Sequence, residues 1–219
     1  LTNVSTNVTK EYDGTREAPQ GFTPTYTVTS GLLTGDSAAT LSHAQARYDS
    51  KDVVGASEVV VSGIGVASIV GTNDSQVTDY EVNTTALAVA GSITAKPISY
   101  SATRTYDGTI DLTGDVTVVG LVQGESLVVS GAQADSKDVA GTDGNVNTPD
   151  NYIVGLTLSD GEGGLLSNYQ QPVTLDATTA PVVITPAPLT VQAADDAKLE
   201  GQADFVGYAG AIYNGFVNG

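Results

Sequence analysis

The sequence predicts an all-β protein made of small β-sandwich or β-grasp-like modules that follow one another in an extended array. Three observations predict this class. The apolar residues are mainly Val, Ala, Leu and Ile, with 10 Tyr and neither Trp nor Met, a composition typical of strands. The 25 Gly supply turn positions. Landmark motifs also recur in the same order, 86 to 94 residues apart, as in a tandem repeat.

Four motifs mark each copy of the repeat. They are Tyr-Asp-Gly-Thr, a Gly-Leu motif that ends in Gly-Asp or Gly-Glu, Asp-Ser-Lys-Asp-Val, and a late Asp-Tyr or Asn-Tyr pair. In this order, they lie at 12–15, 31–36, 49–53 and 79–80 in the first copy. In the second copy they lie at 106–109, 120–125, 135–139 and 168–169. Their order predicts a first repeat at 1–95, a second at 96–186 and the start of a third at 187–219. A β-solenoid is the alternative, but repeats of this length with distinct landmarks favour globular modules.

Within each repeat, alternating residues predict strands. Val4, Thr6 and Val8 alternate before the first Tyr-Asp-Gly-Thr motif. The segment 37–53 is the one place where a helix competes, because Leu41, Ala44 and Tyr48 have helical spacing. Its counterpart at 126–139 contains a Gly and a Val-Val pair, so we expect strands in both copies.

The junctions between repeats are short and contain proline. They are Ala-Lys-Pro at 95–97 and Thr-Pro-Ala-Pro at 185–188. Proline restricts its own backbone and the residue before it to extended conformations, so we expect successive repeats to follow one another end to end. The third repeat opens with a predicted strand that includes Leu189 and Val191 and stops at 219 within a recognisable motif, which suggests that the chain is a fragment.

The motifs resemble a known family. A basic residue two positions before Tyr-Asp-Gly-Thr, then the Gly-Leu motif, Asp-Ser-Lys-Asp-Val and a late Asn/Asp-Tyr strand are similar to the YDG repeats of large secreted bacterial adhesins, the filamentous-haemagglutinin-like exoproteins. The segment 187–219 resembles the start of an MBG repeat, although Leu199, Glu200 and Gly201 stand where Tyr-Gly is usual. The resemblance implies β-rich modules in long arrays, an extracellular location at the bacterial cell surface, a setting of adhesion or biofilm formation, and no catalytic residues.

Charge excludes several classes of partner. The chain has 25 acidic and 8 basic residues and a net charge of −17. Nucleic acids and anionic membrane surfaces both require a Lys/Arg footprint, so we expect neither as a partner. No apolar run approaches the ~18 residues of a membrane-spanning helix. The expected partners are neighbouring repeats of the same chain, with extracellular polysaccharide or a host surface bound through other domains.

The Tyr-Asp-Gly-Thr motif is best interpreted as a turn. Asp-Gly suits a tight turn in which Gly adopts a positive φ and Asp caps the turn with its side chain. Tyr12 and Tyr106 would then pack at strand ends, with their hydroxyls reaching the backbone. The functional alternative, an Asp acid or base, lacks a second carboxylate that recurs with it.

No other residue makes a convincing catalytic or metal-binding candidate. Lys51 and Lys137 each lie between acidic residues, and a solvated ion pair is favoured over a nucleophile, which would need burial. His43 is the only histidine and there is no cysteine, so zinc sites and Ser-His-Asp triads lack their usual groups. We expect His43 at the surface or at a sheet edge.

One loop resembles the opening of a calcium site. Asp143, Asn145, Asn147 and Asp150 alternate as oxygen donors. The position of the expected bidentate acid is Val154, and the first repeat has no equivalent loop. A loop rich in Asp and Asn is therefore favoured, and calcium is left open as the single candidate cofactor.

These observations predict a non-catalytic stalk or spacer segment of a bacterial surface or secreted adhesin. The alternative is a module that itself binds glycan or a host surface. Without Trp, such a module would need exposed Tyr clusters beside Asp or Asn, whereas Tyr at buried strand ends favours the stalk. A glycosidase with paired carboxylates is the third and least favoured hypothesis.

Overall fold

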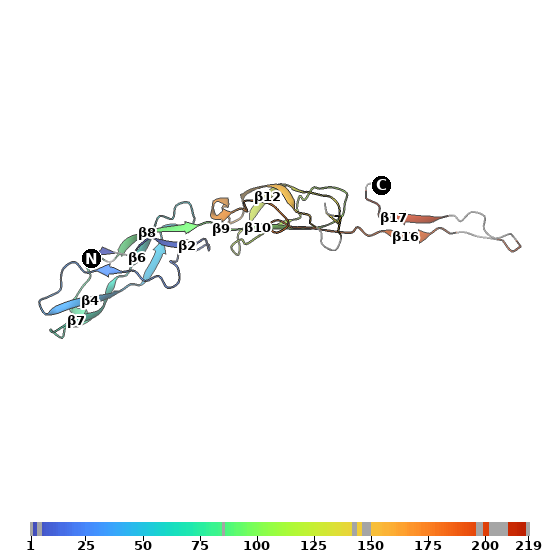
Figure 1. Cartoon of the computed structure of the whole chain (residues 1–219). Helices are drawn as coiled ribbons and strands as arrows, with labels where there is room; N and C mark the ends of the chain where they lie inside the picture. Colours follow the sequence, from blue (N-terminus) through green and yellow to red (C-terminus); the bar gives the residue numbers. More distant parts are fainter. Residues whose placement is uncertain are drawn as a thin grey trace. The chain divides into compact units, whose positions relative to one another are not determined.

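The computed structural model is almost entirely β (Figure 1). It describes residues 2–3, 6–84, 86–141, 144–145, 150–195, 199–201 and 210–217. Within these ranges the regular elements are strands and two short 3-10 helices. The all-β class is therefore confirmed, while the sandwich arrangement stays a prediction. No helix in the described ranges is long and apolar enough to cross a membrane.

The chain forms two compact units whose segments are interleaved in the sequence. The first contains 1–98, 120–126 and 160–171, and the second contains 99–119, 127–159 and 172–219. The segments 120–126 and 160–171 carry motifs of the second repeat and yet belong to the first unit. The motifs of the two repeats therefore meet inside one unit, which is where the candidate site lies.

A four-stranded sheet forms the centre of the first unit. Its strands lie in the order β2 (Val8–Glu11), β8 (Ala86–Thr94), β6 (Glu58–Ser62) and β5 (Gln45–Tyr48). β2 runs parallel to β8, and the other pairs are antiparallel. In β6 every second side chain is buried, and Val59 and Val61 are fully covered. This alternation is the one that a half-buried strand requires.

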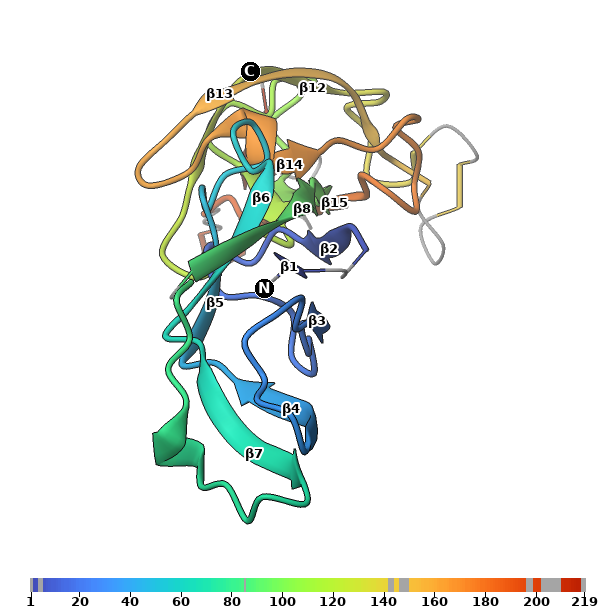
Figure 2. The same cartoon turned by 90° about the vertical axis from the view of Figure 1, so that its left-hand side faces the viewer.

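An antiparallel ribbon and several short elements complete the first unit. Figure 2 shows the ribbon of β4 (Asp36–Ser42) and β7 (Gly65–Gly71) projecting away from the sheet that contains β6 and β8. The short elements are β1 (Thr2–Asn3) paired with β3 (Tyr26–Thr27), β9 (Lys96–Pro97) paired with β14 (Tyr169–Gln170), and the 3-10 helices η1 (Val77–Asp79) and η2 (Leu166–Asn168).

The segment 37–53 is extended, as expected, and the helical alternative is wrong. It supplies β4 and β5, and its counterpart supplies β12 (Leu127–Ala134). Both strands are paired along their length, and the buried Tyr48 hydroxyl at the end of β5 donates to the Val8 carbonyl oxygen at 3.0 Å. A Cβ at Gly91 would lie 3.0 Å from the Tyr48 ring, so only glycine lets β8 pass so close to this ring.

The second unit repeats part of this arrangement. Its sheets are β11 (Val116–Val119), β10 (Ser99–Thr105) and β15 (Val182–Thr185) in that order, β12 with β13 (Ile153–Asp160), and the ribbon of β16 (Thr190–Ala193) with β17 (Ala211–Asn214). Its buried apolar residues include Tyr100, Leu112, Ile153 and Val182. The β16–β17 ribbon confirms the strand predicted at the opening of the third repeat.

In each repeat, the strand that leads into the Tyr-Asp-Gly-Thr motif pairs in parallel with the last strand of the repeat. β2 pairs with β8, and β10 pairs with β15. The amide of Tyr12 donates to the Thr94 oxygen at 2.9 Å, and the amide of Tyr106 donates to the Thr185 oxygen at 2.8 Å. Tyr12 and Tyr106 therefore hold the same place at the end of equivalent ladders.

Both Tyr-Asp-Gly-Thr motifs form the expected turn. Gly14 has a φ of 78° and Gly108 a φ of 79°, so the predicted positive φ is confirmed. Asp13 accepts the Thr15 amide at 2.9 Å, and Asp107 accepts the Thr109 amide at 2.9 Å. Each Asp side chain thus closes its own turn.

This geometry makes a prediction for two glycines of the second unit. Gly108→Ala should lower the free energy of unfolding by about 1–2 kcal/mol, because a Cβ is strained at a positive φ. Gly155→Ala is the matched control, because Gly155 has an ordinary φ and open space around its Cβ position. Denaturant unfolding followed by circular dichroism gives both values. Equal effects of the two substitutions would contradict the assigned role of Gly108.

Candidate functional site: the Glu125 clamp

A glutamate of the second repeat binds two tyrosines inside the first unit. Glu125 accepts the hydroxyl of Tyr12 through Oε1 at 2.6 Å and the hydroxyl of Tyr169 through Oε2 at 2.7 Å. The two rings meet edge to face, with centroids 5.6 Å apart. We call these three residues the Glu125 clamp. It joins the Tyr-Asp-Gly-Thr motif of the first repeat to two motifs of the second.

Local structure positions each member of the clamp. Tyr12 follows β2 and is held by the hydrogen bond that its backbone amide donates to the Thr94 carbonyl oxygen. Glu125 ends a turn in which its amide donates to the Val122 oxygen at 3.0 Å. Tyr169 opens β14, and its hydroxyl accepts the Val122 amide at 3.0 Å. Because Tyr169 contacts both ends of this turn, it holds the turn in the shape that presents Glu125 to Tyr12.

A glycine allows the turn to approach the Tyr-Asp-Gly-Thr motif. A Cβ built on Gly14 would lie 3.0 Å from Cγ1 of Val122, closer than ordinary van der Waals contact. Gly14 therefore has two roles, since its positive φ shapes the Asp-Gly turn and its missing side chain makes room for Val122.

The Asp-Ser-Lys-Asp-Val motif of the first repeat lies beside the clamp and is hydrogen-bonded to it. Lys51 donates to the Tyr12 hydroxyl at 3.3 Å and pairs with Asp52 at 3.1 Å. The fully buried Asn168 donates to Asp52 at 2.8 Å and accepts the Val53 amide at 2.9 Å. All four repeat motifs thus meet here, two from each repeat.

The electrostatics keep both phenols protonated. Burial, followed by the hydrogen bond to Glu125, raises the pKa of Tyr12 and likewise that of Tyr169. Burial alone would raise the pKa of Asp52, but the hydrogen bonds from Asn168 and Lys51 outweigh it and lower that pKa. The hydrogen bond to Asp52 raises the pKa of Lys51. Phenols that hold their protons and a lysine that holds its charge form a cohesive hydrogen-bonded network with the two carboxylates.

The sequence predicted part of this site correctly. The ion pairs of Lys51 and Lys137 are confirmed, with Lys137 lying 3.0 Å from Asp138. Lys51 is not purely local, however, because it also reaches Tyr12. The expectation that the Tyr12 hydroxyl reaches the backbone is wrong, because its acceptor is the Glu125 carboxylate. The sequence does show an acidic residue at the end of both Gly-Leu motifs. Nothing in the sequence pattern, however, links that acid to Tyr12.

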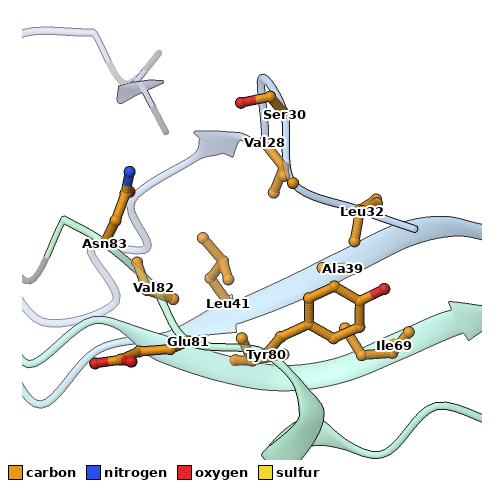
Figure 3. Close-up of a pocket in the computed structure, with 12 residues that line it drawn as sticks. Val28, Ser30, Leu32, Ala39, Leu41, Ile69, Tyr80, Glu81, Val82 and Asn83 are labelled. Atoms are coloured by element: carbon orange, nitrogen blue, oxygen red, sulfur yellow. The ribbon is translucent and has the colours of Figure 1, made fainter.

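A pocket lies elsewhere in the first unit (Figure 3). Its volume is about 230 Å³. In Figure 3, Val28 and Leu32 come from one loop and face Leu41 of β4 and the ring of Tyr80. The lining is about equally polar and apolar, and its one carboxylate is Glu81, so the pocket holds no acid–base pair.

Within the described residues, the other candidates from the sequence do not gather into a metal-binding or catalytic centre. His43 is half-buried in the connection between β4 and β5. In the part of the chain that the structure describes, no three His, Cys, Asp or Glu residues gather closely enough to hold a metal ion. Asp143 and Asn147 of the calcium hypothesis lie outside the described residues, so calcium binding there stays an untested alternative.

Comparisons with known proteins add no family assignment. No protein-family model, no curated protein and no solved structure matches the chain. The resemblance to adhesin repeats therefore stays a hypothesis that rests on the motifs themselves.

The clamp predicts a specific sensitivity to charge. Glu125→Gln should lower the free energy of unfolding of the first unit by about 1.5–3 kcal/mol, because one buried phenol loses its charged acceptor. Glu162→Gln should have little effect, since Glu162 is exposed in the same unit and its carboxylate makes no described contact. Thermal and denaturant unfolding measure both variants. Similar losses in the two variants would show that the clamp does not stabilise the unit.

The raised pKa values also predict a loss of stability in alkali. The unfolded chain releases phenolic protons near pH 10 while folded Tyr12 and Tyr169 retain theirs, so the free energy of unfolding falls as the pH rises above about 10. Tyr169→Phe should flatten this decline, although it lowers stability at neutral pH. Denaturant unfolding between about pH 8 and 11 tests the slope. An unchanged slope in the variant would contradict the assignment.

Proposed function

We propose that the chain is a non-catalytic stalk or spacer segment of a large bacterial surface or secreted adhesin, in support of cell adhesion or biofilm formation. The observation that carries this proposal is a parallel pairing found in each repeat, between the strand that leads into the Tyr-Asp-Gly-Thr motif and the last strand of the repeat. A spacer must pass tension along the chain without unfolding, and this pairing is suited to that task.

The direction of the strands decides how tension acts. A pull on the start of β2 and on the end of β8 draws two parallel neighbours past each other along their own axes. The ladder from Val8↔Gly91 to Glu11↔Thr94 is then sheared, so its hydrogen bonds must fail together. In the second repeat, Ala102↔Val182 to Thr105↔Thr185 is placed in the same way.

The clamp supports the same role. It binds Tyr12, which follows β2 of the first repeat, to two motifs of the second repeat through Glu125. These contacts between the two repeats stabilise the junction, in addition to the restriction that Pro97 places on the backbone. The excess of acid, a net charge of −17, would also keep parallel copies of such a stalk apart.

A ligand-binding module is the second candidate function. It is favoured by Tyr213 and Phe216, whose rings lie 5.9 Å apart and which are 53% and 65% exposed. A hollow of about 380 Å³ is also lined by Phe216 and by Tyr106. Against a ligand-binding module, Tyr12, Tyr48, Tyr100 and Tyr169 are buried. Glycan binding that is lost in Tyr213→Ala would replace the stalk proposal.

The stalk proposal predicts a mechanical anisotropy. Pulling the full chain by its two ends should unfold the first repeat at a force several-fold higher than pulling between cysteines placed at Asp13 and Ala95. These positions follow the same ends of the parallel strands β2 and β8, so the second geometry opens the ladder one bond at a time. The chain has no cysteine of its own, so the attachment points are unique. Single-molecule force spectroscopy measures both, and equal forces would refute a tension-bearing role.

The surface location has its own test. Antibodies raised against the full chain should label intact cells of the source organism. Labelling that requires permeabilised cells would contradict an extracellular stalk, whatever the mechanical result.

A further inference from the structure

In the Glu125 clamp, the second repeat supplies Glu125, Tyr169 and the turn that joins them. The first repeat contains an equivalent arrangement of its own. The Leu33 amide donates to the Tyr80 hydroxyl at 3.1 Å, as the Val122 amide donates to Tyr169 at 3.0 Å. The Tyr80 hydroxyl donates to Asp36 at 2.5 Å, as Tyr169 donates to Glu125. We call Leu33, Asp36 and Tyr80 the Tyr80 surface.

The two copies differ in what covers them. In the second repeat, Tyr12 packs on Tyr169, which is only 6% exposed, and Gly14 approaches Val122. In the first repeat, Leu33 is 66% exposed, and in the described part of the chain Tyr80 has no aromatic neighbour. Leu33 is thus exposed at the position equivalent to Val122, which Gly14 approaches in the second copy, and it lies beside a Tyr–carboxylate pair that is already formed.

We propose that the Tyr80 surface docks the Tyr-Asp-Gly end of another repeat of this kind. The docked end would place its Tyr ring on Tyr80, as Tyr12 lies on Tyr169, and its Gly against Leu33, as Gly14 lies against Val122. A basic residue in the place of Lys51 would face the acidic surface. This inference rests on the proposed spacer function and names the partner that continues the array.

Two residues tune this docking surface. Asp36 is one methylene shorter than Glu125, so its carboxylate reaches less far toward an incoming phenol. Asp79 stands where the second repeat has Asn168, which donates to Asp52. A carboxylate at 79 cannot donate in this way and repels an aspartate in the place of Asp52. Asp36→Glu together with Asp79→Asn should therefore strengthen docking of a Tyr-Asp-Gly end that has the chain's own sequence.

The experiment places such an end next to the surface. A second copy of residues 1–97 is joined directly to Val4 of the chain in place of residues 1–3, so that the added Pro97 runs into Val4 as the natural Pro97 runs into Ile98, the residue 94 positions later. Because the chain has no cysteine, Leu33→Cys in the original copy provides a unique thiol. Its rate of reaction with a maleimide reports how well position 33 is covered.

Two matched thiols calibrate the rates. Val122→Cys lies under the observed contact with Gly14 and should react slowly in both the natural and the lengthened chain. Val173→Cys, at a residue that is 94% exposed in the second unit, should react quickly in both. The inference expects the thiol at 33 to react quickly in the natural chain and several-fold more slowly in the lengthened chain.

The outcomes separate this inference from the proposed function. If the thiol at 33 keeps its fast rate in the lengthened chain, also when Asp36→Glu and Asp79→Asn are present, while the thiol at 122 stays slow, the docking surface is refuted and the clamp stands. If the thiol at 122 reacts as fast as the thiol at 173, the clamp fails, and the spacer proposal loses its junction together with this inference.

Discussion

One carboxylate with two phenol donors organises the end of the first repeat. Glu125 gives both Tyr12 and Tyr169 a charged acceptor, and a buried phenol without an acceptor would cost about 1–3 kcal/mol. Because Tyr12 ends β2 and Tyr169 opens β14, this one interaction connects the first strand of the sheet to a segment that is remote in the sequence. Lys51, Asp52 and Asn168 then arrange their own hydrogen bonds around it.

Tyrosine supplies the large side chains of the core in a chain that has few other large apolar residues. The chain has no Trp or Met and only 3 Phe, so the largest fully buried side chains among the described residues are Tyr12, Tyr48 and Tyr100. Each of these rings brings a hydroxyl into the interior, where it needs a partner. Tyr48 satisfies its hydroxyl within the repeat through Val8, whereas Tyr12 satisfies its own through a residue of the next repeat. The hydrogen bond of one buried tyrosine hydroxyl therefore stabilises the sheet, and that of the other joins the two repeats.

The parallel strand pair and the clamp are complementary. The pairing of β2 with β8 brings the start and the end of a repeat side by side, and the clamp attaches the end of β2 to the motifs that follow. A module built in this way can be joined to a similar one through residues that both copies already contain. This reuse accounts for motifs that are polar and recurrent.

The sequence by itself determined the all-β class, the order of the repeat motifs and the Asp-Gly turns, because composition, spacing and the positive φ of Gly14 and Gly108 are local properties. The ion pair of Lys51 with Asp52 was also predictable, since the residues are neighbours. Only the tertiary structure decided the acceptor of Tyr12, which lies 113 residues away at Glu125. No periodicity encodes such a contact, because it depends on how a turn of one repeat packs on the strand end of another.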